Sequence, residues 1–292
     1  MYWFLAFFCV IVWGTTFISS KVLLLHGLDP EEILLLRFGL AYVCLLPCYH
    51  RQIWLTWRQE LWMILLGVLG GSLYFMTENA ALRYTLATNV SLIASLTPLY
   101  TLALMALFYR GYTRLTPRLI AGVLMAVAGV FCVVMNGHIL LRLNPLGDFL
   151  ALLSGLCWSF YSLAYKHVGD RYPALLITRK LFFWGLVTGL PFMLIGHQAK
   201  DYVAILSQPT VAGNLLFLGL VASLACFFAW NVAVKHLGTI RTNNLLYFNP
   251  LITLLTAHAV LGEPLTWMSL LGMVLTIVGV WWATGRSNEP QA

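Results

Sequence analysis

Long apolar runs follow one another along the whole chain, separated by short clusters of charged or turn-forming residues. Each run is continuous rather than alternating, and its length is about the 20 residues that a helix needs to cross the hydrocarbon core. Strands are disfavoured, because open sheet edges cannot satisfy their backbone hydrogen bonds in lipid. The pattern predicts an all-α integral membrane protein with ten transmembrane helices, near residues 3–20, 31–48, 62–80, 86–108, 118–136, 146–165, 174–196, 212–232, 240–261 and 266–284.

The composition agrees with an exterior that faces lipid. Hydrophobic residues make up 61% of the 292 residues and charged residues only 9%, far less charge than the surface of a soluble protein needs. The net charge of +7 is spread over short loops and forms no patch for nucleic acid. Met1 to Ser20 lacks the basic start and the cleavage site of a secretory signal, so we expect it to be a first span that is kept.

Basic residues gather in the loops that follow the even-numbered spans. The loops after the odd-numbered spans offer only Lys21, Arg83, Arg142 and Lys200. By the positive-inside rule, this bias predicts a multi-pass protein of the inner (plasma) membrane with both termini in the cytoplasm. The basic residues on the predicted cytoplasmic side are Arg51, Arg58, Arg110, Arg114, Arg118, Lys166, Arg171, Arg179, Lys180, Lys235, Arg241 and Arg286.

An internal repeat divides the chain into two similar parts. The matched positions are Trp13 and Trp158, Lys21 and Lys166, Arg37 and Lys180, Asn79 and Asn231, Arg83 and Lys235, Pro98 and Pro250, Gly122 and Gly272, and Gly129 and Gly279. Repeats of five spans, an odd number, must insert with opposite orientations, which is typical of secondary transporters. We therefore predict two five-helix repeats of inverted topology, at 1–137 and 146–285, and a cytoplasmic tail at 286–292.

Several stretches carry a resemblance to a known family: WGTTFISSK at 13–21, the pair Pro30 and Arg37, the run at 78–98, and LGEPLT at 261–266. In this order and in two copies, they resemble the EamA-type drug/metabolite transporters. The resemblance implies a ten-helix fold and the export or uptake of small metabolites, commonly amino acids and related compounds.

The chain departs from the family pattern at one acidic position. Glu263 follows the ninth span, but the corresponding place in the first repeat reads Thr113 and Arg114, inside a basic loop. An acid on one side only need not take part in the transport mechanism. We therefore expect Glu263 to be a loop and capping element.

Glu78 lies in the apolar third span, next to Asn79 and toward the predicted periplasmic end. A carboxylate at membrane depth is costly unless it meets a partner or a watery cavity, so a functional role is the default hypothesis. We predict that Glu78 and Asn79 bind substrate, for example through a substrate ammonium group, and that Glu78 is a candidate for proton coupling. The alternative is a structural ion pair of Glu78 with Arg83 or Lys21.

Polar residues and a proline recur in the fourth and ninth spans. Proline removes a backbone hydrogen bond and frees carbonyl groups, so we predict helix breaks at Pro98 and Pro250. Ser91, Asn243 and Tyr247 lie in the same spans, and we predict that they line a substrate cavity near mid-depth. Hydrogen bonding between helices is the alternative role of these side chains.

Aromatic residues supply a third set of candidates. Trp13 and Trp158 are repeat counterparts, and Tyr161 is close to Trp158, so we predict that the three line the cavity, where a tryptophan can contact an amine through a cation–π interaction. His258, in the ninth span, is a second candidate for proton coupling. Packing against a neighbouring helix is the simpler interpretation of this histidine, because it has no repeat counterpart.

A secondary transporter that exports amino acids or related amphiphiles by alternating access is the favoured function. The alternatives are an intramembrane enzyme that uses Glu78 and His258, and a lipid flippase or scaffold without a solute. We find no P-loop and no hydrolase motif, and the cysteines lie in apolar runs, so we expect no catalytic site, metal or cofactor. The expected partners are a small-molecule substrate and membrane lipids. A monomer is sufficient, because one chain supplies both halves of the cavity. The sequence is also compatible with a homodimer.

Overall fold

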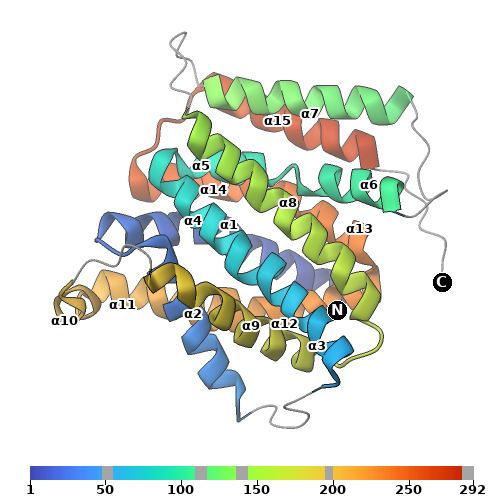
Figure 1. Cartoon of the computed structure of the whole chain (residues 1–292). Helices are drawn as coiled ribbons and strands as arrows, with labels where there is room; N and C mark the ends of the chain where they lie inside the picture. Colours follow the sequence, from blue (N-terminus) through green and yellow to red (C-terminus); the bar gives the residue numbers. More distant parts are fainter. Residues whose placement is uncertain (48–54, 109–116, 136–143, 195–199, 285–292) are drawn as a thin grey trace.

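The computed structural model of the protein describes residues 1–47, 55–108, 117–135, 144–194 and 200–284 (Figure 1). These ranges are helical and contain no strand. The first repeat contains α1 (Tyr2–Leu25), α2 (Pro30–Leu45), α3 (Trp57–Gly67), η1 (Val68–Ser72), α4 (Leu73–Tyr84), α5 (Ala87–Ala94), α6 (Thr97–Phe108) and α7 (Pro117–Met135). The second contains α8 (Pro145–Val168), α9 (Ala174–Leu194), α10 (Tyr202–Leu206), α11 (Pro209–Leu216), η2 (Phe217–Ala225), α12 (Cys226–Leu237), α13 (Thr239–Asn243), η3 (Asn244–Phe248), α14 (Asn249–Leu261) and α15 (Trp267–Thr284).

Consecutive helices join into the predicted spans. The third span is α3–η1–α4, the fourth α5–α6, the eighth α11–η2–α12 and the ninth α13–η3–α14, whereas the other spans are single helices. Seven segments of the described chain are long and apolar enough to cross a membrane, and α7 and α15 contain shorter apolar stretches. With α2, of 16 residues, they form an all-α bundle of ten spans, as predicted. The predicted tail at 286–292 and the pair Thr113 and Arg114 lie outside the described residues.

The third and eighth spans share an irregularity that the apolar pattern does not predict. A π-helical segment interrupts each span, η1 in the first repeat and η2 in the second, and the two segments overlap in the repeat register. Such insertions shift the face that the following helix presents, and they occur often at functional sites. In this protein the helices that follow, α4 and α12, both reach the centre of the bundle.

The last helices of the two repeats, α7 and α15, pack side by side at the edge of the bundle (Figure 1). A Cβ atom on Gly129 would lie 2.4 Å from the carbonyl oxygen of Gly272, and one on Gly279 would lie 2.7 Å from that of Gly122. Glycine is needed at these positions because the two backbones touch. Since Gly122 matches Gly272 and Gly129 matches Gly279, the contact is reciprocal, as it is across a two-fold axis.

The same reciprocity holds for the other helices. α1 packs on α12 and α14, and its counterpart α8 packs on α4, α5 and α6. α2 packs on η2, its counterpart α9 packs on η1, and α2 and α9 also pack on each other. The two inverted repeats therefore interlock, and residues from both surround the centre of the bundle.

Candidate functional site

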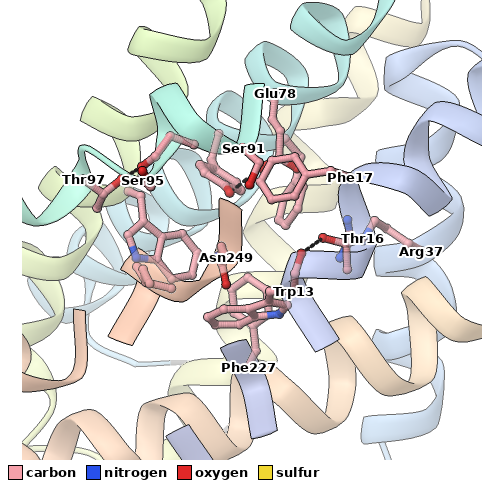
Figure 2. Close-up of a pocket in the computed structure, with 15 residues that line it drawn as sticks. Trp13, Thr16, Phe17, Arg37, Glu78, Ser91, Ser95, Thr97, Phe227 and Asn249 are labelled. Carbon is pink, nitrogen blue, oxygen red and sulfur yellow. Dashed lines mark hydrogen bonds between the residues drawn. The ribbon is translucent and has the colours of Figure 1, made fainter. Parts of the chain in front are cut away.

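A central cavity lies between the two repeats (Figure 2). The cavity volume is about 40 Å³, which is room for a few water molecules. A metabolite can enter only if the surrounding helices move apart. Helices of both repeats supply the lining: Trp13, Thr16, Phe17, Arg37, Tyr74, Phe75, Glu78, Ser91, Ala94, Ser95, Thr97, Trp158, Phe227, Leu246 and Asn249.

Arg37 brings a positive charge to this cavity from α2. The residue is 1% exposed, its Nε donates to the Ser223 hydroxyl at 2.9 Å, and its guanidinium carbon lies 4.2 Å from the centre of the Phe75 ring. The hydroxyl and the ring hold the guanidinium in place. Its Nη1 atom is buried and has no hydrogen-bond partner among the described residues. Because such a donor is costly to leave unpaired, Arg37 is poised to bind an acceptor on a ligand.

Glu78 brings a negative charge to the same cavity from α4. The residue is 2% exposed, and it accepts a hydrogen bond from the hydroxyl of Tyr74, one helical turn earlier. Neither Glu78 nor Arg37 belongs to an ion pair among the described residues. Two opposite charges thus share one small cavity while each keeps bonding capacity for a ligand.

The structural alternative for Glu78, an ion pair with Arg83 or Lys21, is wrong. Arg83 pairs with Asp29, and Lys21 donates to backbone carbonyls, that of Leu82 and that of Thr85 at 3.1 Å. Both basic side chains therefore have other partners, at the end of α4 rather than in the cavity.

Two more buried polar atoms of lining residues have no partner within the described protein. They are Nε1 of Trp158, a donor, and Oδ1 of Asn249, an acceptor. Buried polar groups are nearly always hydrogen-bonded, so these three unpaired atoms, with the Glu78 carboxylate beside them, point to a bound polar molecule. The donors of Arg37 and Trp158 suit a carboxylate, and the acceptors of Glu78 and Asn249 suit an ammonium group.

Aromatic rings form the apolar part of the lining. The rings of Trp13 and Trp158 have centroids 5.3 Å apart, and that of Phe227 lies 5.6 Å from Trp13 and 5.8 Å from Trp158. Nε1 of Trp13 donates to the Ala222 carbonyl at 2.9 Å. The repeat-related tryptophans therefore meet at the cavity, but only the indole N–H of Trp158 remains available there.

The structure brings some of the predicted binding residues to the cavity and leaves others out. Trp13, Glu78, Ser91 and Trp158 line it, and their contact with substrate stays a prediction. The lining does not include the other four predicted residues: Asn79, Tyr161, Asn243 and Tyr247.

Two of the excluded residues join helices by hydrogen bonds. Tyr161 donates to Oδ1 of Asn231 at 2.8 Å, and Nδ2 of Asn231 donates to Thr178 at 2.9 Å. Asn243 donates to the hydroxyl of Ser162 at 3.0 Å. For Asn243 the alternative role, a polar contact between helices, describes what is seen, and Tyr161 makes a contact of the same kind.

The other two excluded residues are buried away from the lining. Asn79 donates to the Pro30 carbonyl at 3.4 Å, which links α4 to the start of α2. Tyr247 packs in a small apolar cluster with Leu96 and Ala126. Their polarity therefore gave no guide to the direction in which they point.

Both predicted helix breaks coincide with interruptions next to the cavity. α5 ends at Ala94 and α6 begins at Thr97, just before Pro98. In the ninth span the 3₁₀ segment η3 precedes α14, whose second residue is Pro250. Thr97 donates to the Ala94 carbonyl at 2.6 Å, so a side chain satisfies part of the freed backbone. Lining residues flank both interruptions.

His258 does not take part in the cavity. It is exposed, and its Nδ1 lies 2.9 Å from the backbone oxygen of Glu263 at the end of α14. The structure therefore does not unite His258 and Glu78 in one site, as the alternative of an intramembrane enzyme that uses both residues would require. Among the described residues, no group of three histidine, cysteine or acidic side chains could hold a metal ion.

Glu263 is a capping element, as expected, but it caps a helix of the other repeat. Its carboxylate accepts from the backbone N–H of Ala87 at 2.8 Å and from that of Thr88 at 3.2 Å, and from the Thr88 hydroxyl at 2.6 Å. A negative charge at the start of α5 also opposes the positive end of the helix dipole. Glu263 therefore fixes the helix that carries Ser91 to the second repeat.

Charged side chains tie together the connections near the end of α4. Asp29 pairs with Arg83 and with Lys200, and Lys200 pairs with Glu32 at 2.9 Å. Tyr202 donates to Glu32 at 2.7 Å, and this hydrogen bond raises the pKa of the Tyr202 hydroxyl above its usual value. The start of α2, the end of α4 and α10 are held together by this network.

The eight predicted binding residues do not include Arg37, Tyr74 and Asn249, all of which line the cavity. Arg37 appeared only as part of a family pattern and of the repeat, although an arginine at membrane depth deserves the same default hypothesis as Glu78. Tyr74 lies one turn before Glu78, a spacing that places both on one helix face. Asn249 directly precedes Pro250, among the polar residues of the ninth span that are candidates for the cavity lining.

The model of the EamA-like transporter family matches the chain twice, at residues 1–135 and 145–285. The chain belongs to the EamA-like transporter family. As a member of this family, it is a multi-pass membrane protein of the transporter class. The two matches cover both halves of the bundle, and each includes residues that line the central cavity.

Several relatives of this EamA-like transporter extend over nearly its whole length. An uncharacterized transporter from Archaeoglobus fulgidus is 26% identical over 96% of each chain. A protein named "Probable amino-acid metabolite efflux pump" from Salmonella typhimurium is 27% identical over 95% of this chain and 93% of its own. A "Probable terminal-alkyne amino-acid exporter" from Streptantibioticus cattleyicolor is 27% identical over 93% and 89%. One crystal structure matches with a TM-score of 0.71 at 19% identity, covering 99% and 98%, which supports the fold alone.

Proposed function

We propose that this protein is a secondary transporter that exports a small amphiphile bearing both a carboxylate and an amine, such as an amino acid or a related compound. The observation that carries the proposal is the pair of opposite charges, Arg37 and Glu78, in one buried cavity without an ion pair between them. A zwitterion satisfies both charges at once, whereas a singly charged solute would leave one of them buried and unpaired.

The aromatic lining supports the amphiphilic part of the proposal. Trp13, Trp158 and Phe227 offer ring faces and edges to the apolar part of a ligand, and a tryptophan face also attracts an ammonium group. Ser91 adds a hydroxyl to the lining. The names of two relatives, an amino-acid metabolite efflux pump and an amino-acid exporter, favour the same substrate class and the outward direction.

Alternating access is the mechanism that this architecture favours. Two inverted repeats can exchange conformations, so one sequence provides two states that open to opposite sides of the membrane. The small volume of the cavity agrees with a closed state. We place the protein in the inner membrane with both termini in the cytoplasm, as the loop charges predict, and Glu78 is our candidate for proton coupling.

The first experiment measures the loss of metabolites from proteoliposomes loaded with a mixture of amino acids and related metabolites, by mass spectrometry. We expect wild-type protein to release a zwitterionic solute and Glu78→Gln to release it at least about tenfold more slowly, because the ammonium partner is gone. Glu31→Gln, which removes a carboxylate outside the cavity lining, should behave as wild type. An imposed pH gradient should alter release by wild type and not by Glu78→Gln.

Two outcomes would contradict the proposal. Release by wild type no faster than from protein-free vesicles, for every solute, would refute transport of this substrate class. Equal release by wild type and Glu78→Gln, with equal response to pH, would remove the role of Glu78 in binding and coupling.

A further inference from the structure

A second pocket lies apart from the central cavity, where α3 begins and α8 ends. Its volume is about 330 Å³, which is much larger than the volume of about 40 Å³ of the central cavity. Its lining comes from the first turns of α3, from the last residue of α8 and from the connection between α8 and α9: Arg58, Gln59, Trp62, Val168, Arg171 and Tyr172. None of these residues lines the central cavity, so the pocket needs its own explanation.

Two arginines dominate the electrostatics of this pocket. Arg58 and Arg171 are exposed, and no described ion pair or side-chain hydrogen bond includes either of them. Within the described part of the chain, no acidic residue lines the pocket. Glu60, also on α3, is buried and pairs with Lys180 at 2.5 Å. Two like charges that face one hollow without a carboxylate repel each other, and a bound anion relieves that repulsion.

The surroundings of the pocket fit a membrane surface. Trp62 is exposed beside the arginines, and its ring contacts that of His167, with centroids 4.4 Å apart and the planes tilted by 33°. Tryptophan is enriched at the headgroup level of membranes. Leu61 and Leu65 are exposed on the same helix and continue an apolar surface away from the pocket. The loop charges also place this end of α3 on the cytoplasmic side, where the leaflet is anionic.

We propose that this pocket binds the phosphate headgroup of an anionic phospholipid. The guanidinium groups of Arg58 and Arg171 bind the phosphate oxygens, to which arginine can donate two parallel hydrogen bonds. The Tyr172 side chain lines the same hollow and borders the headgroup. Trp62 lies at the headgroup level, and an acyl chain follows Leu61 and Leu65 along α3. The site is independent of the proposed transport function, because it shares no residue with the central cavity.

The test uses purified full-length protein titrated with phosphatidylglycerol, with phosphatidylcholine, and with inorganic phosphate. Bound lipid is counted by native mass spectrometry, and the shift of the unfolding temperature is measured in parallel. We expect phosphatidylglycerol to bind wild type more tightly than phosphatidylcholine does, and Arg58→Gln/Arg171→Gln to weaken the binding of phosphatidylglycerol by roughly 30-fold. Both arginines are exposed, so the double variant should keep the fold, which its unfolding temperature without lipid reports.

A matched control removes two exposed charges from the same predicted side. Lys235→Gln/Arg241→Gln should bind phosphatidylglycerol as wild type does, and so should Arg37→Gln in the central cavity. Unchanged binding by Arg58→Gln/Arg171→Gln, or an equal loss in the control double variant, would overturn the site. A temperature shift with inorganic phosphate as large as that with phosphatidylglycerol would show that a soluble anion, not a lipid, occupies it.

Discussion

Arg37 and Lys180 are counterparts in the second spans of the two repeats, yet their surroundings differ. Lys180 is buried, and it bonds to Glu60 at 2.5 Å, which also accepts from Trp184 at 2.7 Å. Arg37 is equally buried but faces the central cavity and forms no ion pair with a carboxylate of the described residues. A buried charge with a partner serves the fold, whereas one without a partner is retained for another reason. The two repeats therefore share the position of a buried cation but not its role.

The positions of the acidic residues explain why Lys180 has a structural role and Arg37 faces the cavity. Glu60 and Glu78 both lie on the third span of the first repeat, and the eighth span, its counterpart, contains neither aspartate nor glutamate. Glu60 neutralises a cation of the second repeat, and Glu78 faces the cavity. Two acids on one span thus make a symmetric architecture chemically asymmetric.

The largest expected effect is on the stability of the fold. Lys180→Met leaves Glu60 buried without its cation, which should lower the free energy of unfolding by about 3–5 kcal/mol. Thermal and denaturant unfolding of the purified protein measures this change. Lys235→Met, at an exposed lysine, is the control and should change little. Glu60→Gln/Lys180→Met should be more stable than Lys180→Met alone, and the reverse order would show that the pair is not what stabilises this region.

Removal of the cavity cation should give the opposite pattern. Arg37→Gln deletes a buried charge that has no ion-pair partner, so we expect stability within about 1 kcal/mol of wild type, or higher. Transport efficiency should fall roughly 100-fold, because the substrate carboxylate loses its charged donor. Paired measurements of unfolding and vesicle release test both statements. A large loss of stability with normal transport by the folded fraction would reverse the roles of the two cations.

The two tryptophans allow a similar comparison at smaller magnitude. Trp158→Phe keeps an aromatic ring but removes the N–H that has no partner among the described residues. The substrate concentration for half-maximal transport should therefore rise about tenfold, while the free energy of unfolding should stay unchanged. Trp13→Phe instead removes the bond to the Ala222 carbonyl and should cost about 1 kcal/mol of stability. Concentration-dependent release and unfolding curves separate the two variants. Identical behaviour of both would mean that the indole N–H groups do not have distinct tasks.

The smallest effect concerns the contact of Glu263 with α5. Glu263→Gln keeps one acceptor oxygen, enough for the N–H of Ala87 or that of Thr88 but not for both, and it loses the charge that interacts favourably with the helix dipole. We expect a loss of about 1 kcal/mol in unfolding free energy, without a change in substrate preference. Glu263→Ala should cost more, since it removes the acceptor as well. A change in which solutes are released would instead connect the cap to the cavity.

The architecture was predictable because span length, loop charge and matched prolines and glycines do not depend on how each helix is rotated. The direction of individual side chains does depend on rotation, and helices that are apolar nearly all round give no face from which to infer it. Asn243 and Tyr161 are polar and near mid-depth, yet they face neighbouring helices. The π-helical segments also change which face of the third and eighth spans points to the cavity. The apolar pattern does not predict these segments.

The central claim is that Arg37 recognises a substrate carboxylate in the cavity between the repeats. The direct test loads proteoliposomes with amino acids and with their amides, which lack the carboxylate, and compares release by wild type and by Arg37→Gln. We predict that wild type releases at least one amino acid about tenfold or more faster than its amide, and that Arg37→Gln abolishes the difference. Release of amino acids and amides by Arg37→Gln at the wild-type rates would contradict the claim.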